Sequence, residues 1–325
     1  MGNTNNITTA DRLRGMIWGQ LVGDAAALGS HWIYNLSELK VAYPNGIHGF
    51  EIPKEGHYHE GNSPGDFTHY GDAAVILLQS VASCGCFNAI HFGSLFTETM
   101  SLGKYPGYID HATRGTIENK HNFENLHPDK AFEFQHGADD DQLATASSLA
   151  PVVAVHFEDS SLLEIVESAT RVRQNNNRAV AYMQTHARIL LELLGGRDVH
   201  SALHRVEEMV AKDTIFGGEL KRKINSAFSY STKSIIDATL ELGQSCPLIS
   251  SFPSSLQSFI KQNESYEHCI LSILRAGGDN AGRASITGAW LGAYLGINGI
   301  PALWRGQLKD VERIHDWVET IVSYT

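Results

Sequence analysis

The sequence has few of the features that mark secreted, membrane or nucleic-acid-binding proteins. Its 325 residues include four cysteines, and no apolar run reaches membrane-spanning length. Cys84 and Cys86 are too close together for the usual zinc spacing and have no second pair, so we expect free thiols and a reducing compartment. Basic residues number 25 against 36 acidic ones, a net charge of -11. This balance disfavours nucleic acid, whose binding depends on Lys and Arg displacing counterions.

The N-terminus also lacks a recognisable targeting segment. Its first residues are polar and contain no apolar signal-peptide region. We therefore expect a cytoplasmic protein with no membrane partner, while export by a route that needs no cleaved signal stays open. Hydrophobic residues make up 42% of the chain and charged residues 19%, which is ample for a core. No repeat or linker divides the sequence, so we expect residues 1–325 to form a single domain.

Apolar residues recur at helical spacing through most of the chain. Segments with this pattern outnumber those with period-two alternation, and no alternation of strands and helices appears, so the sequence predicts an all-α fold. Residues 8–29 are predicted to form one such helix. Its glycines recur every four residues, which indicates that another backbone packs very close to it: Gly15, Gly19 and Gly23.

A carboxylate among glycines lies at the junction of two predicted helices near the C-terminus. Gly277 and Gly278 permit backbone conformations closed to other residues and let a ligand approach the main chain. Asp279 would then lie at a helix start, where backbone N–H groups are free. The next helix is almost wholly apolar, with Asn280 and Arg283 in its first turn. The pattern predicts a polar site at the N-terminus of a buried helix.

Acidic residues mark three other stretches. Asp24 lies in an apolar helix, where a carboxylate is costly unless it is paired or functional. Residues 44–70 are rich in Gly, Pro and His and show no periodicity, so they form a functional or a disordered loop. Asp72 follows this loop at the start of an apolar segment. A run of three carboxylates is either a solvated turn or part of a site, and the apolar residues after it predict a helix: Asp139, Asp140 and Asp141.

These motifs resemble those of the ADP-ribosylglycohydrolase family. Gly19, Gly23, Asp24 and Ala25 match its first motif, and residues 70–73 take the places of its Thr-Asp-Asp-Thr. Residues 277–283, Gly-Gly-Asp-Asn-Ala-Gly-Arg, resemble its last motif in the form found in the branch of the J-type crystallins. The residues His31, Trp32, Ile33 and Tyr34 also resemble this branch, although His31 and Trp32 could equally be a core pair. The resemblance implies a single orthogonal multi-helix bundle.

In the family two magnesium ions bridge the second and last motifs. Hard cations need several oxygen ligands, and of six ligand positions this chain keeps Asp72 and Asp279. The other four positions are replaced by residues with no carboxylate: Tyr70, Gly71, Ala281 and Gly282. We therefore expect no binuclear centre and no cofactor, with at most a single magnesium ion.

The resemblance implies an ADP-ribosylated protein or an ADP-ribose-like small molecule as the partner. Carboxylates can support N-glycosidic cleavage without metal, and crowding raises the pKa of some of them. The catalytic candidates are Asp24, Asp72, Asp139, Asp140, Asp141 and Asp279. The substrate-binding candidates are His31, Trp32, Tyr70, Gly71, Gly277, Gly278, Asn280 and Arg283. We expect a metal-independent hydrolase, with ADP-ribosyl-arginine as the first substrate to consider. The alternative is an inactive ADP-ribose-binding or structural protein, in which Arg283 only neutralises the aspartates.

Overall fold

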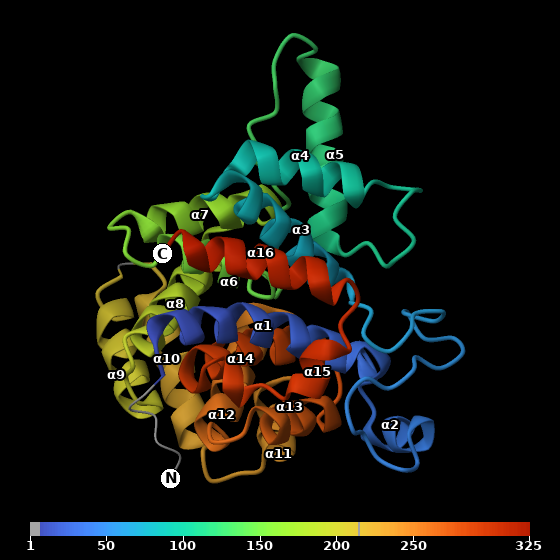
Figure 1. Ribbon diagram of the computed structural model, residues 1–325, viewed down its shortest axis with the longest axis vertical. Helices are drawn as coiled ribbons and strands as arrows, with labels where there is room; N and C mark the ends of the chain where they lie inside the picture. The colour runs from blue at the N-terminus through green and yellow to red at the C-terminus, as the bar shows by residue number, and fades with distance from the viewer. Residues whose placement is uncertain (1–6, 214) are drawn as a thin grey trace.

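The computed structural model describes residues 7–213 and 215–325, and its architecture is all-α, as predicted (Figure 1). Across these residues the only β-type pairings are two isolated bridges, Ala138 with Gln174 and Gln142 with Pro247. In the same part of the chain, no helix has the length and apolar character needed to cross a bilayer. The helices of the first half are α1 (Thr9–Ala27), η2 (Leu28–Ser30), α2 (Leu36–Ala42), α3 (His69–Cys84), α4 (Ala89–Thr99), α5 (His111–Leu126), α6 (Ala150–His156) and α7 (Leu162–Arg173). Those of the second half are α8 (Asn177–Leu194), α9 (Val199–Val210), α10 (Gly217–Ser229), α11 (Ile235–Leu242), α12 (Leu248–Lys261), α13 (Tyr266–Arg275), α14 (Asn280–Leu295), η3 (Ile297–Gly299), α15 (Ala302–Gly306) and α16 (Val311–Ser323).

The centre of the bundle is an antiparallel seam between α1 and α14, which make the most extensive helix–helix contact in the described chain. A Cβ atom added to Gly19 would lie 2.1 Å from the carbonyl oxygen of Gly288, and one added to Gly292 would lie 1.8 Å from that of Gly15. A Cβ atom added to Gly23 would likewise lie 2.3 Å from the carbonyl oxygen of Ala284. The glycine spacing in the first helix therefore does reflect a second backbone in direct contact, as the sequence predicts.

Both helices of the seam are enclosed by the rest of the bundle. Every residue of α14 from Asn280 to Ala293 is buried, because α8, α12 and α13 pack against it. On the other side α1 contacts α3, α6 and α16. Figure 1 shows α5 and the loop after it projecting from the top of the molecule, while residues 43–68 form a long helix-free loop at one side. The seam thus places the N-terminus of α14 deep inside the protein.

One expected helix begins later than predicted. The apolar residues after Asp141 form turns, and α6 starts only at Ala150. The side-chain amide of Gln174 donates to the carbonyl oxygens of Asp140 and Gln142 and holds this segment in an irregular conformation. Pro151 lies in the first turn of α6, where a missing N–H leaves no helical hydrogen bond unmade.

Candidate functional site

Three aspartates of the predicted site gather around the first turn of α3. Asp24 lies near the end of α1, Asp72 lies in the first turn of α3, and Asp279 is the N-cap of α14. Contacts among these three helices bring together segments more than 200 residues apart in the sequence. Each carboxylate is held by a hydroxyl group of the protein.

Asp24 is fully buried and bonded to the residue before α3. Its carboxylate accepts hydrogen bonds from the backbone N–H of Thr68 at 2.9 Å and from the hydroxyl of Thr68 at 2.6 Å. A Cβ atom at Gly71 would lie 2.1 Å from Oδ2 of Asp24, so only glycine fits at that position. Burial raises the pKa of Asp24 to about 7, against the opposing effect of the Thr68 donors.

Asp279 is also without exposed surface, and Tyr70 reaches it from α3. The Tyr70 hydroxyl donates to Oδ2 of Asp279 at 3.1 Å, and the N–H of Gly282 donates to Oδ1 at 3.3 Å. Burial raises the pKa of Asp279 to about 6, and the nearby charge of Arg283 opposes this rise. The phenol side chain therefore connects the second and last motifs directly.

The loop before Asp279 depends on its two glycines. Both have φ of +67°, a left-handed conformation that other residues rarely adopt. The carbonyl of Gly278 accepts from the N–H of Trp32 at 2.8 Å, and its N–H donates to the carbonyl of Ile33 at 2.8 Å. A Cβ atom at Gly277 would lie 2.5 Å from the same Ile33 carbonyl oxygen. Gly277 and Gly278 thus make room for residues 31–34.

The polar side chains in the first turn of α14 donate hydrogen bonds to other residues of the protein. Arg283 is buried, and its guanidinium donates to the carbonyl of Gln244 at 2.7 Å and to that of Gly277. Burial lowers the pKa of Arg283 to about 10. The Asn280 amide donates to the Ser30 hydroxyl at 2.9 Å. Both side chains therefore bond neighbouring segments, at Ser30 and at Gln244, to the first turn of α14.

Asp72 differs from the other two aspartates because it keeps some exposed surface. Its carboxylate accepts a hydrogen bond from the hydroxyl of Tyr105. Burial raises the pKa of Asp72 to about 6, although the Tyr105 hydrogen bond opposes the rise. Asp72 can therefore change its protonation state near neutral pH while remaining reachable from solvent.

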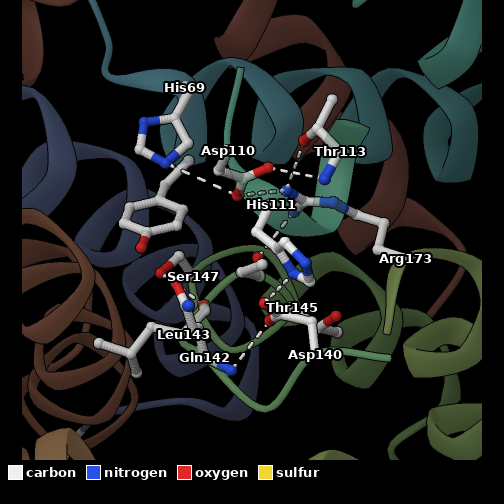
Figure 2. Close-up of polar contacts among 12 residues, drawn as sticks. His69, Asp110, His111, Thr113, Asp140, Gln142, Leu143, Thr145, Ser147 and Arg173 are labelled. Atoms are coloured by element: carbon white, nitrogen blue, oxygen red, sulfur yellow. Dashed lines mark hydrogen bonds and ion pairs between the residues drawn. The ribbon is translucent and has the colours of Figure 1, made fainter. Parts of the chain in front are cut away.

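The acidic run after α5 lies outside this group of aspartates. Asp140 is buried and accepts from the Gln174 amide at 2.8 Å, with Nδ1 of His111 at 3.0 Å from its carboxylate (Figure 2). Asp141 pairs with Arg178 at 3.1 Å. The exposed Asp139 accepts from Asn176 at 2.6 Å. Their side-chain partners come from α5, α8 and the connection between α7 and α8. Among the described residues, no hydrogen bond joins them to Asp24, Asp72 or Asp279.

His69, Asp110 and Arg173 lie around the site although they are not among the predicted site residues. His69 lies 3.6 Å from Asp110, which also faces the buried Arg173 at 3.5 Å (Figure 2). Burial favours a raised pKa for Asp110, but Arg173, His69 and Thr113 outweigh it, and the pKa is lowered. His31 is buried beside His69, with ring centroids 6.0 Å apart. The histidine content of residues 44–70 was the one available signal for this region.

Trp32 lies at the surface edge of these rings. Its φ of 64° is unusual for a bulky residue and marks a conformation that its surroundings impose. The Trp32 ring makes edge contacts with Tyr58 and Tyr108 at centroid distances of 5.1 and 4.7 Å. Both tyrosines are exposed, so the three rings form an aromatic surface next to the buried histidines.

The residues at the second and last motifs do not fit two magnesium ions. Such a centre needs several free carboxylate or hydroxyl oxygens around each ion. Here Tyr70 and Gly71 occupy two ligand positions, Ala281 and Gly282 occupy two more, and the Tyr70 hydroxyl bonds to the Asp279 carboxylate. Asp72 is then the one carboxylate of these two motifs with exposed surface to offer an ion, which is too few to bridge two Mg²⁺ even when water completes their shells.

Comparisons with known proteins agree with this arrangement of helices. The family model described as ADP-ribosylglycohydrolase matches residues 5–325. Crystallin J1A of Tripedalia cystophora is 26% identical over 323 residues, covering 96% of each chain. Crystallin J1B of the same organism is 27% identical over 326 residues, again covering 96% of each chain. A solved chain titled "ADP-ribosylglycohydrolase-related protein complex" is similar with a TM-score of 0.76 at 19% identity, over 97% of this chain and 98% of that one, and so has the same fold.

Proposed function

The chain belongs to the ADP-ribosylglycohydrolase family, and from this premise we propose that it acts on ADP-ribosyl groups without a binuclear magnesium centre. The observation that carries the proposal is the hydrogen bond of 3.1 Å between the Tyr70 hydroxyl and Asp279. It joins the two motifs whose other metal-ligand positions are replaced. A hydroxyl donor here satisfies a buried carboxylate that would otherwise need a cation.

The proposed reaction is hydrolysis of the N-glycosidic bond between ADP-ribose and a protein side chain, with arginine as the first acceptor to test. Water attacks the anomeric carbon, the bond from that carbon to nitrogen breaks, and the nitrogen leaves with a proton. A carboxylate can stabilise the positive charge of the transition state and take the proton from water. Asp72 suits this role because it is partly exposed and its pKa is raised to about 6.

The remaining candidates have supporting roles in this proposal. Asp24 and Asp279 are buried, and their hydrogen bonds fix the start of α3, because their partners Thr68 and Tyr70 come just before Asp72 in the chain. The exposed aromatic surface of Trp32, Tyr58 and Tyr108 provides ring faces and edges on which the base of an ADP-ribosyl group can stack. Gly278 bonds to the backbone of Trp32 and Ile33 beside this surface, Asn280 bonds to the preceding Ser30, and Arg283 bonds to the carbonyl of Gly277. In the acidic run, the exposed Asp139 and the partly exposed Asp141 are available for contacts with the substrate at the edge of the site.

A second candidate function is a binding or structural role without turnover. It is favoured by the burial of Asp24 and Asp279, neither of which has surface through which a substrate could touch it. The relatives named as crystallins point in the same direction. In this case the carboxylate hydrogen bonds only stabilise the fold.

Release of ADP-ribose from an arginine-ADP-ribosylated protein would distinguish the two candidates. The assay is run with magnesium and with EDTA, on the wild type, on Asp72→Asn, and on the exposed control Asp129→Asn. Turnover that survives EDTA, falls at least 100-fold in Asp72→Asn and is unchanged in the control supports the hydrolase. Turnover that needs magnesium contradicts the proposal.

If neither buffer supports turnover, binding is measured by thermal unfolding with ADP-ribose. A ligand at ~100 times its dissociation constant adds about 2.7 kcal/mol to the free energy of unfolding. A rise in the unfolding temperature that Trp32→Ala abolishes would indicate the binding form of the function. No rise would favour the purely structural form.

A further inference from the structure

Three histidines from separate segments meet in the interior beside the candidate site. His31 follows η2, His59 belongs to the loop of residues 43–68, and His69 is the first residue of α3. Their exposed fractions are 0%, 4% and 1%. One nitrogen atom from each lies within 4.8 Å of the corresponding atoms of the other two. We refer to these three residues as the histidine cluster.

Four of the six ring nitrogens of the histidine cluster lack a hydrogen-bond partner in the described part of the chain. Nε2 of His31, Nε2 of His59 and both ring nitrogens of His69 are buried without a hydrogen bond among the described residues. Buried polar atoms are normally paired, and an unpaired one carries a desolvation penalty. Four such atoms in one place indicate that the cluster has a further partner.

Two carboxylates lie next to the histidine cluster. Nδ1 of His31 is 3.6 Å from Oδ1 of Asp279, and Nε2 of His69 is 3.6 Å from Oδ2 of Asp110. The N–H of Ala281 donates to Nδ1 of His31 at 3.4 Å, and this long hydrogen bond has to break when Nδ1 carries the proton and faces Asp279. Histidines that bind a metal through one nitrogen usually donate the other N–H to a carboxylate, which fixes the ring. Asp279 and Asp110 are placed to do this for two of the three ligands.

We propose that His31, His59 and His69 bind a divalent transition metal ion of the zinc class. Three imidazoles without a thiolate suit Zn²⁺ and its neighbours, whereas Mg²⁺ prefers oxygen ligands. With Zn–N bonds of about 2.0–2.1 Å, tetrahedral ligand atoms lie roughly 3.3 Å apart. The present separations, of up to 4.8 Å, have to shorten toward this value when an ion binds. The fourth position is filled by water or an anion.

The ion would connect the long loop to the core. His59 is the one ligand contributed by residues 43–68, which contain no helix. His57, two residues earlier, already approaches the carbonyl of His31 through Nε2 at 2.7 Å. The Trp32 ring covers the cluster, with its centroid 4.2 Å from that of His31 and 5.2 Å from that of His69. Binding would therefore order the loop and the aromatic surface together.

The test is metal binding by the full chain after treatment with a chelator and its removal. Zn²⁺ is titrated calorimetrically, and Co²⁺ is added as a visible probe because tetrahedral Co²⁺ absorbs far more strongly than the hydrated ion. We expect one ion per chain, an intense Co²⁺ spectrum, and an affinity at least 100-fold weaker in His59→Leu. The control His48→Leu removes an exposed histidine of the same loop and should leave the affinity unchanged.

A second variant keeps the test decisive if one substitution disturbs folding. His31→Leu alters the opposite side of the cluster, and circular dichroism checks that each variant is folded. Loss of binding in both folded variants supports the site. Absence of any bound Zn²⁺ in the wild type, or binding that survives both substitutions, would overturn it and assign the unpaired nitrogens to buried water.

Discussion

Two buried polar clusters lie next to each other in this protein and differ in how completely their atoms are paired. In the first, the carboxylates of Asp24, Asp72 and Asp279 each accept a hydrogen bond from a protein hydroxyl. In the second, the imidazoles of His31 and His59 each leave a buried nitrogen without one. The two are in contact through Asp279, which lies 3.6 Å from His31.

This difference in hydrogen bonding separates a cluster that needs no cation from one that still has atoms free to bind an ion. Where hydroxyl side chains satisfy the carboxylates, the cluster is complete without a cation, and its residues contribute to stability whether or not metal is present. Where nitrogens stay unpaired, the cluster becomes stable only with a partner from solution. Substitutions in the first cluster should therefore reduce stability whether or not metal is present, and those in the second should matter only when it is.

The largest expected effect is from Asp279→Ala. It leaves the Tyr70 hydroxyl without its acceptor and the buried Arg283 without its nearby negative charge. Leaving a buried charge without a compensating charge nearby typically reduces stability by about 3–5 kcal/mol. Urea unfolding should show a loss of this size with or without zinc, while Asp129→Ala, on the surface, should stay within about 0.5 kcal/mol of the wild type. A loss seen only with zinc would remove the distinction between the clusters.

The second effect is a pH dependence from Asp24. Its pKa is raised to about 7 in the folded protein, whereas in the unfolded chain it has an ordinary value near ~3.9. The folded state therefore holds the extra proton between these values, and stability falls as pH rises through this window. A shift of roughly 3 units corresponds to about 4 kcal/mol.

The comparison of wild type with Asp24→Asn between pH 4 and pH 8 isolates this contribution. The buried histidines act in the opposite direction, because burial lowers the pKa of His59 to about 3 and of His69 to about 4. Their effect is present in both proteins and cancels in the difference. If the free energies of unfolding of the two proteins differ by the same amount at every pH, Asp24 is ionised throughout the range.

A smaller effect is expected from Tyr70→Phe. The substitution removes one hydroxyl and leaves the ring in place, so Asp279 loses its donor from α3. We expect a loss of about 1–3 kcal/mol, the usual penalty for leaving a buried acceptor unpaired. The pKa of Asp279 should also rise further, since the Tyr70 hydrogen bond lowers it. An unchanged free energy of unfolding at pH 8 would argue against the role given to this tyrosine.

The smallest effect is expected from His59→Leu in the presence of a chelator. The substitution replaces an unpaired buried polar side chain by an apolar one of similar size, which should change stability by less than ~1 kcal/mol in either direction. With zinc added, only the wild type should gain stability. A large loss in the chelated protein would show that His59 already has a partner within the fold.

The fold could largely be predicted from local patterns. Gly15, Gly19 and Gly23 indicated a close helix contact, and Gly277 and Gly278 before Asp279 indicated a helix start, because both signals depend on residues near in sequence. The glycines did not identify α14 as the partner of α1, because their spacing shows that some helix packs closely and does not show which one. The helix expected directly after Asp141 was wrong because side-chain bonds from Gln174, over 30 residues away, hold that segment in turns.

The pairing within the two clusters could not be predicted in this way. Thr68 and Asp24 are 44 residues apart, and Tyr105 and Asp72 are 33 apart. His59 lies in a loop without periodicity, so nothing in the sequence gives the direction of its side chain. Composition indicated that the loop was unusual, but only the folded path of the loop places His59 beside His31.

The seam between α1 and α14 also has a consequence for the order in which the chain folds. Its two helices are separated by more than 250 residues, and nearly every residue of both is buried. During synthesis α1 leaves the ribosome long before its partner exists, so its apolar surface has to be shielded until almost the whole chain has emerged. Contacts between such distant segments form slowly, and partly folded chains expose surface that aggregates. We therefore expect slow refolding after dilution from denaturant, and dependence on chaperones during synthesis, because the first helix waits for a partner made more than 250 residues later.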